Sequence, residues 1–182
     1  MSNDIITLDL GFLSTFKKED VRKVVQEFVQ GAYTVVERSL VEVTKDSDIP
    51  EFSDLNFAFN EVTVSRKDTT SMITVETLLN NEYLTSYWAD GLIISTPTGS
   101  TGYSLSCNGP VILPNAKNLV ITPIAPHNLN ARPMVIADNT SIQLEVDSRD
   151  KDFAISIDSK ITSVPKNTKI FIEKTILIIK RI

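Results

Sequence analysis

The sequence predicts a mainly β protein of the α+β class, an antiparallel β-sandwich with one short helix near its N-terminal end. Three observations lead to this fold class. Many short apolar segments alternate with polar turns, as in antiparallel sandwiches. A single stretch, residues 17–30, has helical periodicity instead. The 182 residues are 42% hydrophobic and 23% charged, which is the composition of a protein with a buried core.

Residues 17–30 form the predicted helix. Their apolar side chains follow the i, i+3, i+4, i+7 spacing that places them on one helical face. These side chains are Val21, Val24, Val25 and Phe28. Gly31 comes next and suits the left-handed residue that ends many helices. We expect residues 1–32 to form a small N-terminal unit and residues 33–182 to form the β-sandwich.

Strand patterns fill the rest of the chain. Alternating side chains from Ala32 to Glu42 predict a strand of about a dozen residues. The tripeptide Asn80-Asn81-Glu82 predicts a hairpin turn. Further strands are predicted at residues 55–65, 71–79, 83–88, 91–95, 119–123, 134–136, 141–146, 153–157, 169–173 and 176–182.

Charge and hydropathy exclude two classes of partner. The net charge is −5, and the 18 Lys and Arg residues are scattered, so no basic face is available for nucleic acid. No stretch reaches the roughly 18–20 apolar residues that span a bilayer. Asp4 and Asp9 stand where a signal peptide would carry basic residues. We therefore expect a cytoplasmic protein that binds neither nucleic acid nor a membrane.

Cysteine and histidine usage argues against a metal centre. With a single cysteine, Cys107, and a single histidine, His127, the chain can form neither an intrachain disulfide nor a Cys-based zinc cluster. We predict no metal site. His127 has no Ser or Asp at a spacing that implies a triad, so we interpret it as structural. Cys107 has no local basic cluster, which predicts an unreactive thiol.

Residues 90–106 hold the candidate functional site. An apolar strand, residues 92–94, leads into a loop of small hydroxylated residues that contains Gly99 and Gly102, and then into a short helix. Glycine permits close backbone approach, and N–H groups at a helix start can donate to phosphate or ribose oxygens. The loop adds the hydroxyls of Thr98, Ser100 and Thr101. This pattern predicts a nucleotide site.

The same loop has a second interpretation, a Ser/Thr-capped turn without a ligand. Two known nucleotide loops are excluded. The loop lacks the Lys-Ser/Thr ending of a P-loop, and it has neither the third glycine nor the downstream acid of a Rossmann fingerprint.

Acidic side chains near this loop strengthen the nucleotide interpretation. The pair Asn60-Glu61 interrupts an apolar segment, and neighbouring side chains in a strand point to opposite faces, so at least one can face inward. An inward carboxylate needs a partner, such as a ribose diol. A β-bulge or a solvated edge is the alternative. Asp90 precedes the strand while Ser104 and Ser106 follow the loop, so we expect these groups to converge near one strand end.

In their order along the chain, these motifs resemble those of the ATP-dependent NAD kinase family. The resemblance covers nearly the whole chain. It rests on Asn60-Glu61, residues 90–106, the segments 123–129 and 132–133, and Leu10-Gly11-Phe12-Leu13. That last segment resembles the point where the family's N-terminal α/β domain is followed by its β domain. The resemblance implies the family's C-terminal β-sandwich, with residues 1–32 as a remnant of the α/β domain.

The resemblance also implies an NAD site. Asn60 and Glu61 would hold the nucleoside of the acceptor NAD, and Asp90 would bind an amide or a base amino group at the other end of the dinucleotide. Lys160, where many relatives carry Gln, would place a charge near the dinucleotide. The wall of the site would be Thr98, Thr101, Gly102, Tyr103, Ser104, Leu105 and Ser106, with Tyr103 packing against a ring.

The implied activity is transfer of the γ-phosphoryl of ATP, with Mg²⁺, to the adenosine 2′-hydroxyl of NAD, giving NADP. The implied assembly is a homo-oligomer, a dimer or a tetramer. The family's base lies in a Gly-Gly-Asp-Gly motif, and this sequence contains no Gly-Gly dipeptide, so we assign no catalytic residue to this chain. Two alternatives stay open: a non-catalytic NAD- or NADP-binding or oligomerisation module, and a plain β-sandwich interaction domain.

Overall fold

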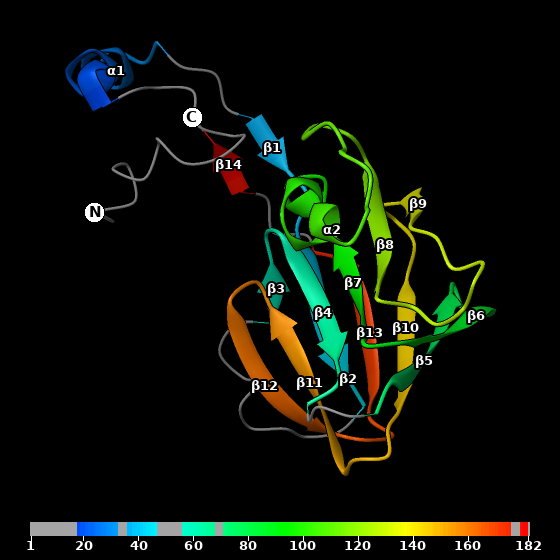
Figure 1. Cartoon of the computed structure of the whole chain (residues 1–182). Helices are drawn as coiled ribbons and strands as arrows, with labels where there is room; N and C mark the ends of the chain where they lie inside the picture. The colour runs from blue at the N-terminus through cyan, green and yellow to red at the C-terminus, as the bar shows by residue number, and fades with distance from the viewer. Residues whose placement is uncertain (1–17, 33–35, 47–55, 68–70, 176–178, 182) are drawn as a thin grey trace. The chain divides into compact units, whose positions relative to one another are not determined.

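The structure, a computed structural model, describes residues 18–32, 36–46, 56–67, 71–175 and 179–181 (Figure 1). The chain divides into two units, residues 1–36 with 180–182, and residues 37–179. No helix in the described ranges is long and apolar enough to cross a membrane.

The N-terminal unit contains the predicted helix. A 3-10 turn, η2 (Lys18–Asp20), leads into α1 (Val21–Val29). Gly31 has φ +74° and ends the helix as predicted, because a residue without Cβ adopts the left-handed conformation at little cost. The expected first residue, Lys17, lies outside the described residues, and so does the 10–13 segment of the resemblance.

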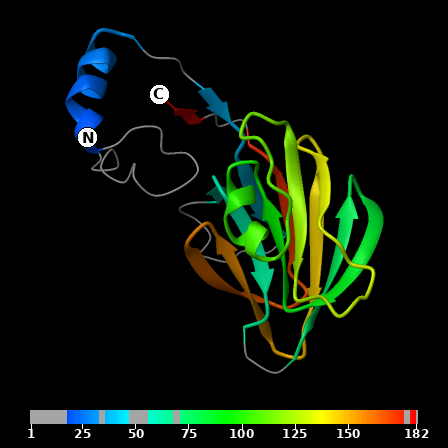
Figure 2. The ribbon, with the colours of Figure 1, turned by 45° about the horizontal axis from the view of Figure 1, so that its top comes forward.

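The larger unit is the predicted β-sandwich, built from two six-stranded antiparallel sheets (Figure 2). The first sheet has the order β3 (Phe57–Ala58), β2 (Val41–Lys45), β13 (Lys169–Lys174), β10 (Ile142–Asp147), β5 (Ile73–Leu79), β6 (Glu82–Ala89). The second has the order β12 (Lys160–Pro165), β11 (Asp152–Ile157), β4 (Glu61–Ser65), β7 (Gly91–Ser95), β8 (Asn118–Ile124), β9 (Met134–Ala137). A separate pair joins β1 (Val36–Arg38) to β14 (Ile179–Arg181).

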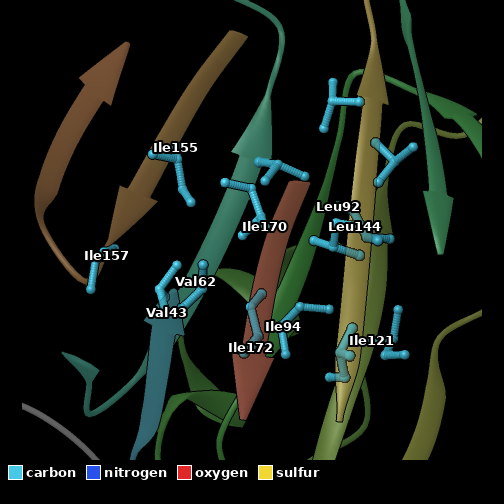
Figure 3. Packing of buried hydrophobic residues seen from close by; sticks show 14 of the residues in the cluster. Val43, Val62, Leu92, Ile94, Ile121, Leu144, Ile155, Ile157, Ile170 and Ile172 are labelled. Atoms are coloured by element: carbon cyan, nitrogen blue, oxygen red, sulfur yellow. The ribbon is translucent and has the colours of Figure 1, made fainter. Parts of the chain in front are cut away.

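The hydrophobic core lies between the two six-stranded sheets. Buried and half-buried residues alternate along β10 and β11, as expected for strands with one face on the core. Both sheets contribute branched aliphatic side chains to one cluster (Figure 3). The labelled members are Val43, Val62, Leu92, Ile94, Ile121, Leu144, Ile155, Ile157, Ile170 and Ile172.

Strand β7 departs from this alternation, since all five of its residues are buried. Its inner face meets the core, and α2 (Tyr103–Ser106), which follows η4 (Gly99–Thr101), packs against β7 from outside the core. In Figures 1 and 2, α2 lies at the end of β7 where the strand leads into the loop. The candidate loop therefore folds back over the strand that precedes it.

The predicted strand 55–65 is wrong in its middle. Leu55 lies outside the described residues, and the remainder forms β3 and β4, which belong to different sheets. Phe59 and Asn60 carry the chain from one sheet to the other. Asn60 is thus outside any strand, because its backbone groups are bonded to a turn and a loop instead of a ladder.

Other boundaries differ less. The predicted strand 32–42 separates into β1 and β2, with Ser39 and Leu40 between them, and residues 33–35 lie outside the described ranges. From the predicted strand 176–182, the structure describes β14 alone. The hairpin at Asn80-Asn81 is confirmed, with φ of 52° and 66°, the left-handed pair that a tight two-residue turn requires.

Strand β12 has no counterpart among the predicted strands. It is the outer strand of its sheet, its Ile161 is 73% exposed, and it ends at Pro165, which an edge strand tolerates. A polar, exposed edge strand lacks the apolar alternation by which the other strands are recognised.

Candidate functional site

The site begins with residues 59–61, where every backbone polar group is hydrogen-bonded to one of two residues. Asp158 Oδ2 accepts the N–H of Phe59 at 2.9 Å. Its Oδ1 accepts the N–H groups of Asn60 at 2.8 Å and Glu61 at 3.1 Å. The N–H of Asp158 donates to the carbonyl oxygen of Glu61 at 3.0 Å. The short turn between β11 and β12 thereby fixes the start of β4.

Thr96 holds the other side of this segment. Its hydroxyl donates to the carbonyl oxygen of Phe59 at 2.6 Å, and its N–H donates to that of Asn60 at 2.9 Å. The same hydroxyl accepts the N–H of Gly99 at 3.2 Å. Thr96 is fully buried, so these bonds are shielded from water. It joins the Asn60-Glu61 segment to the glycine loop.

The two glycines of the loop face this segment directly. A Cβ on Gly99 would lie 2.2 Å from the carbonyl oxygen of Asn60, which no side chain can accommodate. A Cβ on Gly102 would lie 3.4 Å from Oε2 of Glu61, an ordinary contact distance. Gly99 therefore allows the two backbone segments to approach, while Gly102 lies next to the Glu61 carboxylate.

The Glu61 carboxylate is the most unusual group of the site. Its Oε2 is buried, and within the described part of the chain it has no hydrogen-bond partner. Burial raises the pKa of Glu61, and the negative charge of Asp158 raises it further. A buried acceptor without a donor costs free energy, so this oxygen is ready to accept a hydrogen bond from a ligand hydroxyl or amine.

Helix α2 presents three of its four side chains to solvent. Tyr103 is 46% exposed and Leu105 is 44% exposed, and Ser106 is exposed as well. Ser104 is fully buried, and its hydroxyl lies 2.8 Å from the Thr122 hydroxyl on β8. Ser104 thus anchors the helix to the sheet and offers no hydroxyl to solvent.

The hydroxyls of the loop also serve its own structure. Thr98 and Ser100 are buried. Ser100 Oγ donates to the carbonyl oxygen of Pro97 at 2.7 Å and accepts the N–H of Ile112 at 2.9 Å. Thr101 is half-buried, and its hydroxyl bonds to the Thr98 carbonyl oxygen at 3.5 Å. The expected donation from Ser100 to a ligand is wrong, because its proton is bound within the loop.

Asp90 lies at the opposite end of β7 from the loop. After β7 the chain folds back over the strand, and Ser104 bonds Thr122, whose Cα pairs with that of Ile93 in the middle of β7, so the expected convergence of Asp90 with Ser104 and Ser106 stays a prediction. Asp90 Oδ2 pairs with Nη2 of Arg66 at 3.1 Å. Burial raises the pKa of Tyr103, and the charges of Cys107 and Asp90 raise it further.

Lys160 is the first residue of β12, two positions after Asp158, and its Cα pairs with that of Ile157. The turn between β11 and β12 lies at the same end of the sheet as the start of β4 and α2 (Figure 1). The side chain is exposed and makes no ion pair with any described residue. Asn60, Glu61 and Lys160 thus share one end of the sandwich.

His127 and Cys107 lie outside this arrangement. The His127 ring packs on Trp88, with centroids 4.8 Å apart, and the backbone N–H of His127 donates to the Trp88 carbonyl oxygen at 2.8 Å. Cys107 is half-buried, and burial raises the pKa of its thiol. Within the described ranges, no group of three or more His, Cys, Asp and Glu side chains is arranged to hold a metal ion.

Asp158 and Thr96 are the residues that sequence reasoning did not place in the site. Thr96 belongs to the recognised 90–106 motif, but its partner is not visible in the sequence. Asp158 contacts a residue 98 positions earlier in the chain. Only its place in a short turn between two strand patterns marks it, since a side-chain carboxylate in a turn commonly binds backbone N–H groups.

Comparison with known proteins assigns the chain to a family. Residues 59–174, well over half of the chain, match the ATP-NAD kinase C-terminal domain. The chain belongs to the NAD kinase family. The NAD kinase of Flavobacterium psychrophilum is 59% identical over 166 residues, which cover 91% of this chain and 56% of that protein. That of Flavobacterium johnsoniae is 60% identical with the same two coverages. The chain thus spans little more than half the length of these NAD kinases.

Two solved structures support the same NAD kinase fold. Yeast NADH kinase, crystallised with NADH, superimposes with a TM-score of 0.83 at 28% identity, over 92% of this chain and 49% of that one. An NAD kinase from Archaeoglobus fulgidus in complex with ATP gives 0.79 at 25% identity, over 93% and 63%. The family and the β-sandwich expected from the sequence are both confirmed.

Proposed function

We propose that this chain forms the acceptor site of an NAD kinase, an enzyme that transfers the γ-phosphoryl of ATP to the adenosine 2′-hydroxyl of NAD and so makes NADP. The relatives that share most of this chain are named NAD kinases. The observation that carries the proposal is the buried, unpartnered Oε2 of Glu61 beside Gly102.

Glu61 and Asn60 have the chemistry that a nucleoside needs. A carboxylate accepts hydrogen bonds from ribose hydroxyls or an exocyclic amine, and the Asn60 amide both donates and accepts. Because the backbone of residues 59–61 is already satisfied by Asp158 and Thr96, both side chains are free for a ligand. A bound nucleoside would supply the donor that Glu61 Oε2 lacks.

The length of β7 suits a dinucleotide. Five residues at about 3.3 Å each separate Asp90 from the glycine loop by roughly 16 Å. A ligand that meets both Glu61 and Asp90 must be longer than one nucleoside. Asp90 would accept from an amide or amino group at the far end, and the exposed Tyr103 ring between them would stack on a base. Thr98, Thr101, Gly102, Leu105 and Ser106 would complete the wall, with Ser104 supporting it from below.

Phosphoryl transfer depends mainly on positioning and on neutralising phosphate charge. The described residues fit the first task, because they hold and orient the acceptor. They do not fit a metal site, so we derive no step through the Mg²⁺ that accompanies ATP in the proposed reaction. Lys160, exposed at the same end as Glu61, is the described cation that we propose for the dinucleotide phosphates. We further propose a cytoplasmic homo-oligomer, a dimer or a tetramer, with residues 1–32 as a remnant of the family's α/β domain.

A second candidate is a module that binds NAD or NADP without turnover. This candidate concerns the 182 residues by themselves, which contain no Gly-Gly dipeptide and hence no Gly-Gly-Asp-Gly base motif. Both candidates require the same dinucleotide site and differ only in turnover.

Calorimetric titration with NAD and NADP tests the site that both candidates share. The wild-type chain should bind, and Glu61→Gln should weaken NAD binding roughly 10- to 100-fold, the cost of losing a charged hydrogen bond. Glu82→Gln, which neutralises an exposed carboxylate at the start of β6, is the matched control and should bind as the wild type does. If the folded wild-type chain bound neither dinucleotide at millimolar concentration, the interaction domain would be favoured instead.

A further inference from the structure

We propose that Asp158 is a positioning residue of the acceptor site, which fixes residues 59–61 so that the side chains of Asn60 and Glu61 face a nucleoside. This inference rests on the proposed function for the identity of the ligand. The positioning itself is independent of the ligand and can be measured without it.

The hydrogen bonds of residues 59–61 carry the first step. Of their six backbone polar groups, Asp158 satisfies four: three N–H groups through its carboxylate and one carbonyl through its own N–H. Charge-assisted bonds from a carboxylate to N–H groups are stronger than neutral ones. Phe59 and Asn60 lie between the two sheets, and Glu61 only begins the β4 ladder opposite Ser95, so without Asp158 the N–H groups of Phe59 and Asn60 would lose their partners.

The backbone of Asp158 shows why the carboxylate lies where it does. Asp158 has φ +50°, in the left-handed region, which Asp and Asn adopt more readily than most residues. The tight turn Asp158-Ser159 between β11 and β12 requires this conformation. In it, the Asp158 carboxylate reaches the N–H groups at the start of β4. The backbone of residues 59–61 is therefore fixed by the turn of the β11–β12 hairpin, to which these residues do not belong.

Asp158 also acts on Glu61 electrostatically. Glu61 is flanked by Ser95 on β7, by the Asp158-Ser159 turn that Lys160 follows, and by Gly102 next to Tyr103. Burial raises the pKa of Glu61 first, and Asp158 is the charged group among the described residues that raises it further. A nucleoside that hydrogen-bonds the ionised carboxylate would bind less tightly as the pH falls through this pKa. Removing the charge of Asp158 lowers the pKa of Glu61, so the loss of nucleoside binding should occur at a lower pH.

Two variants of Asp158 separate its roles. Asp158→Asn keeps one acceptor oxygen and a residue type that tolerates the turn, but it loses the charge and one of the three accepted bonds. Asp158→Gly removes the whole side chain and still suits φ +50°. Asp152→Asn is the matched control, because Asp152 begins the same strand β11 and bonds Lys67 and Ser163 instead.

Three measurements on the full chain test the inference. Amide exchange at residues 59–61 should accelerate in Asp158→Gly and remain as in the wild type in Asp152→Asn. NMR titration of the Glu61 carboxyl should give a lower pKa in Asp158→Asn. NAD affinity should fall about tenfold in Asp158→Asn, and the pH at which binding is lost should decrease. A purely structural role would weaken binding without moving that pH.

The outcomes distinguish this inference from the proposed function. Unchanged amide exchange in Asp158→Gly, together with an unchanged Glu61 titration in Asp158→Asn, would overturn the role of Asp158. Absence of NAD binding by the wild type would overturn the proposed ligand, while the exchange and titration experiments still decide whether Asp158 presets the segment. If Asp158→Gly did not fold, Asp158→Asn carries both the exchange and the titration tests.

Discussion

The ionised Glu61 carboxylate lowers the free energy of unfolding at neutral pH, because it is buried beside another negative charge. Its pKa is raised in the folded chain by burial and by Asp158. A raised acid pKa means that the folded state binds protons more tightly than the unfolded state, so this residue's contribution to stability falls as the pH rises from the unfolded pKa to the folded one. Above that window the full destabilisation is present.

Glu61→Gln should therefore stabilise the folded chain at pH 7, in contrast to its weakening of NAD binding. The difference from the wild type should shrink as the pH falls from the raised folded pKa to about 4.5, the unfolded value, below which both states of the wild type become protonated. Urea unfolding at a series of pH values measures this. An equal stability difference at pH 7 and at pH 4 would contradict the electrostatic explanation.

Gly99 is the residue at which the site tolerates no side chain. Gly99→Ala places a Cβ 2.2 Å from the backbone of Asn60, so the two segments must separate. We expect a loss of about 1–3 kcal/mol in the free energy of unfolding, together with weaker NAD binding. Gly102→Ala is the milder change in the same loop, because its Cβ would lie 3.2 Å from the carbonyl oxygen of Gly99, and it should cost less free energy of unfolding. Denaturant unfolding and calorimetry compare the two variants.

At the scale of the elements, β7 sets the distance between the two acidic groups of the proposed site. Glu61 pairs with Ser95 at one end of this strand, and Asp90 precedes its other end. All five residues of this strand are buried, so packing keeps it in its extended conformation and fixes the distance between its two ends. This spacing follows from five residues in extended conformation and needs no side-chain contact between the ends.

Asp90→Asn should weaken NAD binding roughly tenfold if this strand end meets the ligand. Stability should change by less than about 1 kcal/mol, because the Arg66 pair that it breaks is partly exposed. Asp147→Asn, at the exposed end of β10, is the control. Calorimetry and thermal unfolding separate the two effects, and an unchanged affinity would remove Asp90 from the site.

The structure also shows which elements a sequence pattern can predict. Strands with one face on the core, such as β10 and β11, were predicted because their side chains alternate. The segment 55–65 reads as one strand because both of its halves are apolar. It is two strands in different sheets, because the turn at Asp158 offers the backbone of residues 59–61 better partners than a continued ladder.

At the scale of the whole molecule, binding and turnover are separate properties of this chain. We propose that its described residues hold an acceptor, whereas these 182 residues contain no Gly-Gly-Asp-Gly motif. We expect the purified 182-residue chain to bind NAD or NADP weakly and to make no NADP from NAD, ATP and Mg²⁺. NADP formation is measured by enzymatic cycling.

The control for this experiment is Glu61→Gln, purified in parallel. Turnover by a contaminating host kinase would be equal in both preparations, whereas turnover by this chain would fall in the variant. NADP formation that is lost in Glu61→Gln would show that the chain supplies a base of its own.

The sequence by itself determined the family, the β-sandwich class and the positions of the acidic and glycine motifs, because these depend on residue type, spacing and local periodicity. The tertiary structure alone decided which groups meet. It brought Asp158 to residues 59–61, turned the Ser104 and Ser100 hydroxyls inward, and placed Asp90 at the far end of β7 from the glycine loop. These relations depend on how strands far apart in the chain pair and pack, which no local pattern encodes.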